Sequence, residues 1–216
     1  MDHFEKIGVG IEGADGSKQP QLRVVGMPGK HVPPNGIMEK FNDIVKAVSI
    51  RISSSFLLIS LCLIETELSK LQIPPTNGWM LELGHGKPNM SDFTCGYRIY
   101  ISGDTLMVDE LKEIPRRYAG HKSDLMLAHL GGTTIPSPSV GRLIKPLALM
   151  VTMDAEQGLQ LIRLIQPDLT IPIHYDDYDV FASPLEDFRR AIEAAGLTHK
   201  VVFLDRQDQY RFQVRG

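Results

Sequence analysis

Short runs of apolar and β-branched residues, separated by glycine, proline and polar residues, recur along this chain and predict β-strands. We expect these strands at residues 22–26, 78–84, 96–104, 125–132, 147–154 and 169–174. Apolar residues spaced three or four positions apart predict amphipathic helices at residues 106–118, 155–166 and 183–197. Strands that alternate with helices predict an α/β or α+β fold in which helices cover a sheet.

Residues at the helix ends carry their own signals. Asp154 stands where an N-cap is expected for the second helix. Ser183 is expected to cap the third, with Pro184 at the first helical position and Gly196 just past the end. The closing runs VVFLD and QYRFQV predict a C-terminal hairpin.

The composition favours a globular protein that acts on small molecules. A chain of 216 residues with 43% apolar residues suits a single domain, and no internal repeat or second boundary is visible. The net charge of −3 leaves no basic surface for a phosphate backbone, so nucleic acid is not expected as the main partner. Cys62 and Cys95 are too few for a disulfide framework, and the start lacks a signal-peptide pattern, which predicts a cytoplasmic protein. Neither GxGxxG nor a P-loop occurs, so a nucleotide-binding module has little support.

Residues 48–72 differ in composition from their surroundings because aliphatic residues and serine crowd them. The uninterrupted apolar part is too short to cross a bilayer, which takes about 20 residues, so no transmembrane segment is expected. Two interpretations stay open. One is an inserted, buried helix. The other is a translated intron, because Val-Ser and the closing Gln can be encoded by intron border sequences, and whole codons preserve the reading frame.

Three polar residues occupy equivalent positions, just after predicted strands: His31, Asp104 and His174. Imidazole nitrogen and carboxylate oxygen suit Zn²⁺, and one carboxylate can bridge two ions about 3.5 to 4 Å apart. The pattern therefore indicates a metal site. The plainer alternatives also stand, since an Asp after Gly often caps a helix or forms a turn, and a single loop histidine is often structural.

Three further residues lie near these strand ends. His129, in AHLGG, and Asp154, in TMDA, suit hydrogen-bonding neighbours of a site or caps better than metal ligands. His129 and Asp176 are candidates for orienting or acid–base roles. No other catalytic residue is assigned.

The strings GYRIYISGDT, DLMLAHLGGT, VTMDAEQG and TIPIHYDDYDVFASPLEDF together resemble the carboxyl-terminal half of the metallo-β-lactamase superfamily. The similar branch comprises zinc-dependent hydrolases related to ascorbate-phosphate lactonase and N-acylphosphatidylethanolamine phospholipase, and PGKH resembles the third metal motif. The resemblance implies a four-layer αββα sandwich, up to two zinc ions and a metal-bound hydroxide as nucleophile. It implies that His31 binds the first metal, that Asp104 bridges, and that His174 binds the second.

The chain departs from that family in one respect: the signature His-x-His-x-Asp-His is absent. We therefore expect a partial sandwich, over residues 1–216, that lacks most of the first αβ half. Each metal would keep two protein ligands where zinc sites use three or four, so zinc is expected to bind weakly or not at all. The uncovered face of the sheet is expected to favour self-association.

Two functions follow as hypotheses. The first is a metal-dependent hydrolase that acts on an ester, lactone or phosphodiester and is impaired in this chain. The second is a catalytically inactive fragment or interaction remnant of a longer hydrolase. The sequence leaves open whether the chain is itself an enzyme.

Overall fold

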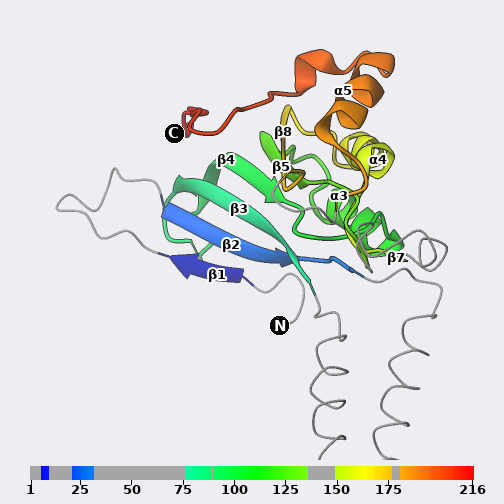
Figure 1. The fold of residues 1–216 in the computed structure, drawn as a ribbon. Coiled ribbons are helices and arrows are strands. Elements are labelled where there is room, and N and C mark those ends of the chain that lie inside the picture. The colour runs from blue at the N-terminus through cyan, green and yellow to red at the C-terminus, as the bar shows by residue number, and fades with distance from the viewer. Residues whose placement is uncertain (1–5, 10–20, 32–75, 89, 136–148, 177–180) are drawn as a thin grey trace, which may run out of the picture.

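The structure, a computed structural model, describes residues 6–9, 21–31, 76–88, 90–135, 149–176 and 181–216. A six-stranded sheet in the order β1-β2-β3-β4-β5-β8 forms its centre, and β6 and β7 pair separately (Figure 1). The strands are β1 Lys6–Val9, β2 Gln21–Met27, β3 Gly78–His85, β4 Thr94–Ile101, β5 Leu125–His129, β6 Thr134–Ile135, β7 Leu149–Met150 and β8 Leu169–Ile173. The α-helices are α3 Glu113–Arg117, α4 Ala155–Ile165 and α5 Leu185–Ala194, and the 3-10 turns are η1 Asp109–Lys112 and η4 Thr198–Lys200.

Strand direction places several loops at one end of the sheet. Strands β1 to β4 pair antiparallel in sequence order, whereas β4, β5 and β8 pair parallel. Because β3 runs opposite to both β2 and β4, the strands β2, β4, β5 and β8 all point the same way. We call the end where these four strands finish the carboxyl end of the sheet, and the opposite end the amino end.

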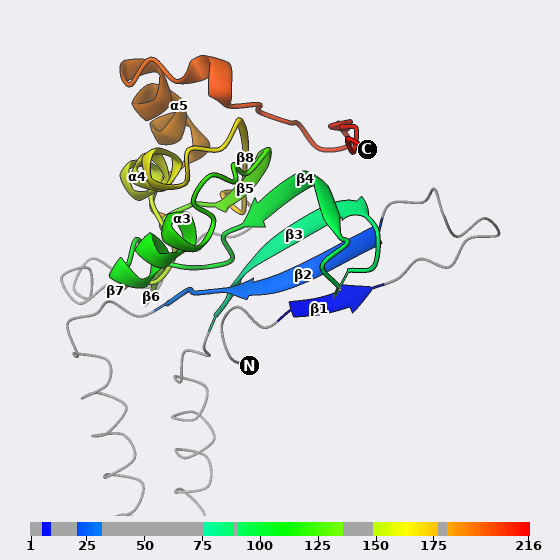
Figure 2. The ribbon, with the colours of Figure 1, turned by 180° about the vertical axis from the view of Figure 1, so that it is seen from behind.

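The two faces of the sheet are covered differently. Helices α3, α4 and α5 gather on one side of the sheet in both views (Figures 1 and 2). Strands and helices share the main buried cluster there, which includes Met27, Met80, Tyr100, Met126, Leu111, Leu159, Phe188 and Ile192. The other face carries a smaller cluster, with Tyr97, Ile99, Leu125 and Ile171 buried and Leu81, Leu83 and Leu127 half-buried. The predicted α/β class is confirmed, with one helical layer on the six-stranded sheet described.

The predicted helix ends are confirmed in part. The Asp154 carboxylate accepts a hydrogen bond from the Gln157 N–H at 2.9 Å, as expected of an N-cap. The prediction for Ser183 is wrong, because Pro184 is the N-cap of α5. The Ser183 hydroxyl instead accepts from the Ala155 N–H at 3.1 Å, so it satisfies a free donor in the first turn of a different helix.

The helix predicted at 106–118 is shorter than expected. Helical geometry begins only at Asp109, and it ends at Arg117. Leu106 and Val108 are buried as the apolar spacing suggested, but they lie in extended chain. The Leu106 N–H donates to the Lys30 carbonyl at 2.8 Å, so a bond to a distant loop replaces the first helical turn.

The predicted C-terminal hairpin is wrong. Val201 forms only an isolated parallel bridge with Thr170, and no strand follows it. The last residues lie across β4 instead, where the Phe212 ring stacks on Tyr97 with centroids 4.3 Å apart. The tail thus covers part of the sheet face that has no helices.

Two further hypotheses from the sequence concern residues 48–72 and a transmembrane segment. Residues 48–72 lie outside the described residues, so neither interpretation of that segment is tested. Across the ranges that the structure describes, no helix is both long and apolar enough to cross a bilayer. The single-domain interpretation stays a prediction.

Candidate metal centre

Four polar side chains meet at the carboxyl end of the sheet. His31 follows β2, Asp104 follows β4, His129 ends β5, and His174 comes directly after β8. One Asp104 oxygen lies 3.8 Å from His31 Nε2, and the other lies 3.6 Å from His174 Nδ1. The His129 and His174 rings have centroids 5.7 Å apart. The structure therefore brings together the three residues singled out as metal ligands, and it places His129 beside them.

The loops that carry His31 and Asp104 are joined to each other by hydrogen bonds. The Lys30 N–H donates to Thr105 Oγ1 at 2.8 Å, and the Lys30 carbonyl accepts from the Leu106 N–H. Between β4 and these bonds, Gly103 has a φ of +64°, and a Cβ there would collide with the Asn77 carbonyl. Only glycine fits that turn, which explains the Gly-Asp order in the sequence.

His174 sits on a strained backbone. Its φ of 61° is left-handed, a conformation that costs a non-glycine residue roughly 1–2 kcal/mol. Its Nδ1 lies 3.4 Å from the Leu130 carbonyl oxygen. A carbonyl can only accept, so a hydrogen bond in this contact requires the proton on Nδ1. Strain of this kind clusters at functional sites.

Ser102 positions His129, and sequence reasoning missed it. Its fully buried hydroxyl oxygen accepts from the His129 backbone N–H at 2.9 Å and lies 3.5 Å from His129 Nδ1. The hydroxyl donates to the Gly103 carbonyl at 3.0 Å. The available signal was a small hydroxyl residue at a strand end, on the same face as the buried Tyr100.

Burial sets the charge of two of the histidines. Burial lowers the pKa of His31, with the Asp104 carboxylate opposing that shift and His174 adding to it. The pKa of His129 is lowered by the same causes in the same order. Both rings are therefore neutral at pH 7, and a neutral imidazole has the lone pair that metal binding and proton acceptance require.

Two buried polar atoms at this site lack hydrogen-bond partners, namely His31 Nδ1 and Asp104 Oδ1. Such atoms cost about 1–3 kcal/mol each, so they mark places where a bound group would be stabilising. In donor type and burial the residues fit a zinc ion. In arrangement they fall short: among the described side chains, no group of three or more His, Cys, Asp or Glu lies close enough together to hold a metal.

The other sequence candidates make different contacts. Asp154 caps α4 and so has a structural role. Asp176 is exposed, and one of its oxygens lies 3.9 Å from Arg206 Nη2 at the surface. Of the two acid–base candidates, His129 is thus the one that the structure places beside the candidate ligands.

The chain is similar in sequence to archaeal proteins named UPF0173 metal-dependent hydrolases. It is 28% identical to one from Archaeoglobus fulgidus over 117 residues, which is 54% of this chain and 42% of that relative. A relative from Hyperthermus butylicus is 30% identical over 92 residues, or 39% of this chain and 40% of the relative. The aligned regions thus span less than half the length of these relatives. No protein-family model matches the chain.

Solved structures share the fold. An isothiocyanate hydrolase from Delia radicum gut bacteria aligns with a TM-score of 0.54 and 13% identity, over 89% of this chain and 56% of that one. A possible metal-dependent hydrolase from Veillonella parvula aligns with a TM-score of 0.52 and 11% identity, over 87% and 53%. At such low identity these matches show the fold alone. The chain spans about half the length of each of these two structures.

Proposed function

We propose that this chain carries part of the metal site of a metal-dependent hydrolase, with His31, Asp104 and His174 as the ligands. The observation that carries the proposal is the carboxylate of Asp104, which lies between two imidazoles at the shared end of four parallel-pointing strands. The two orphaned buried atoms support it, as do the names of the relatives. The motifs that resemble the metallo-β-lactamase superfamily favour zinc over other metals.

Each residue has a definite task in this proposal. Asp104 offers one oxygen toward each imidazole, which suits a bridging role. His174 lies with its Nδ1 3.6 Å from the Asp104 carboxylate, so its imidazole adjoins the bridging group. His129, held by Ser102, is placed to accept a proton from a water or substrate at this site. A bound Zn²⁺ would lower the pKa of a coordinated water to about 7 and so make a nucleophile available at neutral pH.

We propose that the substrate is a small molecule with an ester, lactone or phosphodiester bond, the classes expected of the family that the motifs resemble. The number of protein ligands limits the activity that we expect. Three protein ligands are few for up to two ions, since zinc sites use three or four each. We therefore expect weak metal binding and slow turnover from the chain as given.

A second candidate function rests on the sheet face that lacks helices. Leu81, Leu83 and Leu127 are only half-buried there. An apolar surface of this kind favours association. In this alternative the chain is catalytically inactive and pairs with itself or with a partner through that face.

Metal content tests the first proposal. The purified chain is treated with a chelator, zinc is added back, excess is removed, and bound zinc is measured by elemental analysis. Asp104→Ala is compared with Asp109→Ala, a matched control whose carboxylate is exposed and pairs with Lys112. Because the donor set is incomplete, we expect partial retention of zinc in the wild type and the control, and none in Asp104→Ala.

Zinc retention that is equal in both variants, or absent from the wild type, would rule out Asp104 as the central ligand. Sedimentation of the same samples tests the alternative. A monomer at every concentration contradicts pairing through the sheet face. A dimer without zinc favours the inactive interaction protein.

A further inference from the structure

A cavity of about 720 Å³ lies at the amino end of the sheet, remote from the candidate metal centre. It opens on the face that carries the helices, between the start of β4 and the loop that leads from α3 to β5. Three arginines and one glutamate line it, together with aromatic and small polar residues. Its volume falls within the roughly 300–1,000 Å³ typical of small-molecule pockets.

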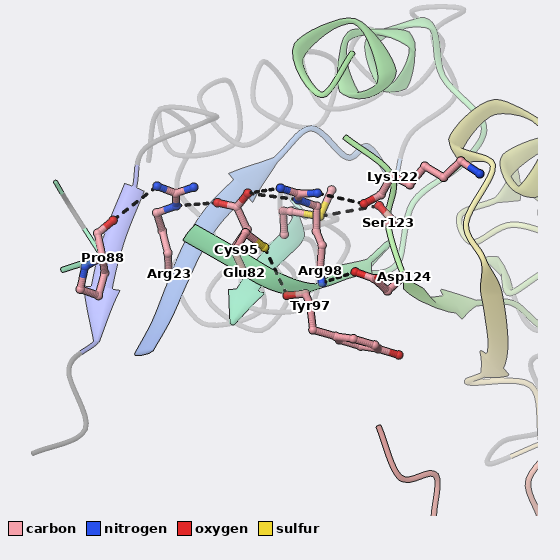
Figure 3. A network of polar contacts seen from close by, with 10 residues as sticks. Arg23, Glu82, Pro88, Cys95, Tyr97, Arg98, Lys122, Ser123 and Asp124 are labelled. Carbon is pink, nitrogen blue, oxygen red and sulfur yellow. Dashed lines mark hydrogen bonds and ion pairs between the residues drawn. The ribbon is translucent and has the colours of Figure 1, made fainter. Parts of the chain in front are cut away.

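The floor of the cavity is a row of charged residues across three strands. The register pairs Arg23 of β2 with Glu82 of β3, and Glu82 with Arg98 of β4 (Figure 3). The Arg23 Nε donates to one Glu82 oxygen at 2.5 Å. The Arg98 Nε and Nη2 lie 3.1 and 3.0 Å from the other oxygen. A single carboxylate therefore pairs with both guanidinium groups.

Positive charge is in excess in this largely buried row. The side chains of Glu82, Arg98 and Arg23 are only 3%, 10% and 17% exposed. Arg117, at the cavity wall, adds a third guanidinium. The other hydrogen bonds of the row go to neutral carbonyls, since Arg23 also donates to Pro88 and Arg98 to Lys122. Carbonyls satisfy N–H groups without cancelling their charge, so the row Arg23–Glu82–Arg98 holds one more guanidinium than it has carboxylates.

Aromatic rings add apolar walls. The Arg23 guanidinium lies 4.4 Å from the centroid of Phe93, and that of Arg98 lies 5.4 Å from the centroid of Tyr118. Stacking holds both guanidiniums in place without consuming all their N–H donors. A fixed planar fork with free donors is the arrangement that binds carboxylates and phosphates.

We propose that this cavity is a second binding site, specific for a small organic oxyanion. The charged group, a carboxylate or a phosphate, would sit against the guanidiniums, and an apolar or aromatic body would lie between Phe93 and Tyr118. The volume supports an organic body because it is far larger than an inorganic phosphate ion needs. The proposal does not depend on the metal centre, which lies at the opposite end of the strands.

Cys95 supplies a reporter for the site. Its thiol lines the cavity and is half-buried, and burial raises its pKa, so it stays protonated at neutral pH. It is a slow target for alkylation and has no nucleophilic role here. A ligand in the cavity should make it slower still.

The test uses the full chain, treated with a chelator so that the metal centre plays no part. Cys62 is replaced by serine, which leaves Cys95 as the sole cysteine. The alkylation rate with N-ethylmaleimide is measured with phenyl phosphate, benzoate or inorganic phosphate, and affinity is measured by calorimetry. We expect phenyl phosphate or benzoate to slow alkylation about tenfold at saturation, a change that corresponds to ~1.4 kcal/mol.

A matched pair of variants locates the binding. Arg117→Gln removes a cavity guanidinium at an exposed position and should weaken binding about tenfold. Arg116→Gln removes the neighbouring, exposed charge that pairs with Glu113 and should change nothing. Equal effects of the two would overturn the site, as would unaltered Cys95 alkylation with all three probes. Protection of Cys95 by inorganic phosphate but not by the two organic probes would contradict the proposal that the site is specific for an organic oxyanion. If Arg117→Gln fails to fold, the alkylation rates of Cys95 in the chain with an unsubstituted cavity still decide whether the probes bind there.

Discussion

The two ends of the sheet hold polar residues in opposite ways. At the carboxyl end, Asp104 lies 3.6 and 3.8 Å from its two histidines, its side chain is 33% exposed, and one buried oxygen has no hydrogen-bond partner. At the amino end, Glu82 contacts two arginines at 2.5 to 3.1 Å and is 3% exposed. The contacts of Asp104 are long and leave one carboxylate oxygen without a hydrogen bond. The contacts of Glu82 are short, but its one negative charge is shared by two arginines.

The difference follows from where the residues sit. His31, Asp104 and His174 lie on loops beyond strand ends, where backbone strain and a required glycine set the geometry. Glu82 and its partners lie within strands, where the register fixes neighbours on one face. Loop residues are free to take up a ligand, and strand residues contribute to folding stability as well.

The largest effect expected from this comparison is on stability. Glu82→Gln leaves two largely buried guanidiniums without a carboxylate, and removal of one partner of a buried pair costs about 3–5 kcal/mol. Asp104→Asn, at the looser end, should change the free energy of unfolding by less than ~1 kcal/mol. Urea denaturation measures both. Similar losses from the two variants would erase the distinction between the ends.

A smaller effect is expected at Ser102. Ser102→Ala leaves the partly buried His129 N–H without its acceptor, which costs about 1 kcal/mol of unfolding free energy. The exposed Ser91→Ala serves as the control and should be neutral. The variant should also shift the NMR signals of the His129 ring. An unchanged ring signal would show that Ser102 does not position it.

The smallest effect at neutral pH is expected from Tyr118→Phe, which keeps the ring beside Arg98 and removes only the hydroxyl. Burial, followed by the charge of Glu82, raises the pKa of Tyr118 to about 12, against about 10 in an unfolded chain. The unfolded chain therefore loses this proton first, so stability is complete below pH 10 and falls as the pH rises toward 12.

Replacement by phenylalanine should make that alkaline decline shallower while leaving stability at pH 7 within about 0.5 kcal/mol. Urea midpoints between pH 7 and 11.5 measure it. Parallel alkaline declines in the wild type and the variant would contradict the assigned pKa shift. The remaining slope is expected from Tyr97, Tyr100, Tyr175 and Cys95, because burial raises the pKa of each of these groups as well.

Local patterns were enough to predict several features of the fold and the site. Alternating and continuous apolar runs located β2, β3, β4, β5 and β8 to within a few residues, because a strand shows its period of two in its own sequence. The Asp154 cap was likewise predictable, since its acceptor and donor are three residues apart. The polar residues after strand ends identified His31, Asp104 and His174 as neighbours.

Only the tertiary structure decided the rest, because those features depend on contacts between distant parts of the chain. Ser183 does not cap its own helix, and its hydroxyl instead accepts a hydrogen bond from the Ala155 N–H. Residues 106–108 stay outside the helix, where the Leu106 N–H bonds to the Lys30 carbonyl and the Met107 N–H bonds to the Gln157 side chain. The Arg23–Glu82–Arg98 row joins residues 59 and 16 positions apart. Periodicity says which face a side chain takes, but the register between strands, set by packing of the whole core, determines which charges meet.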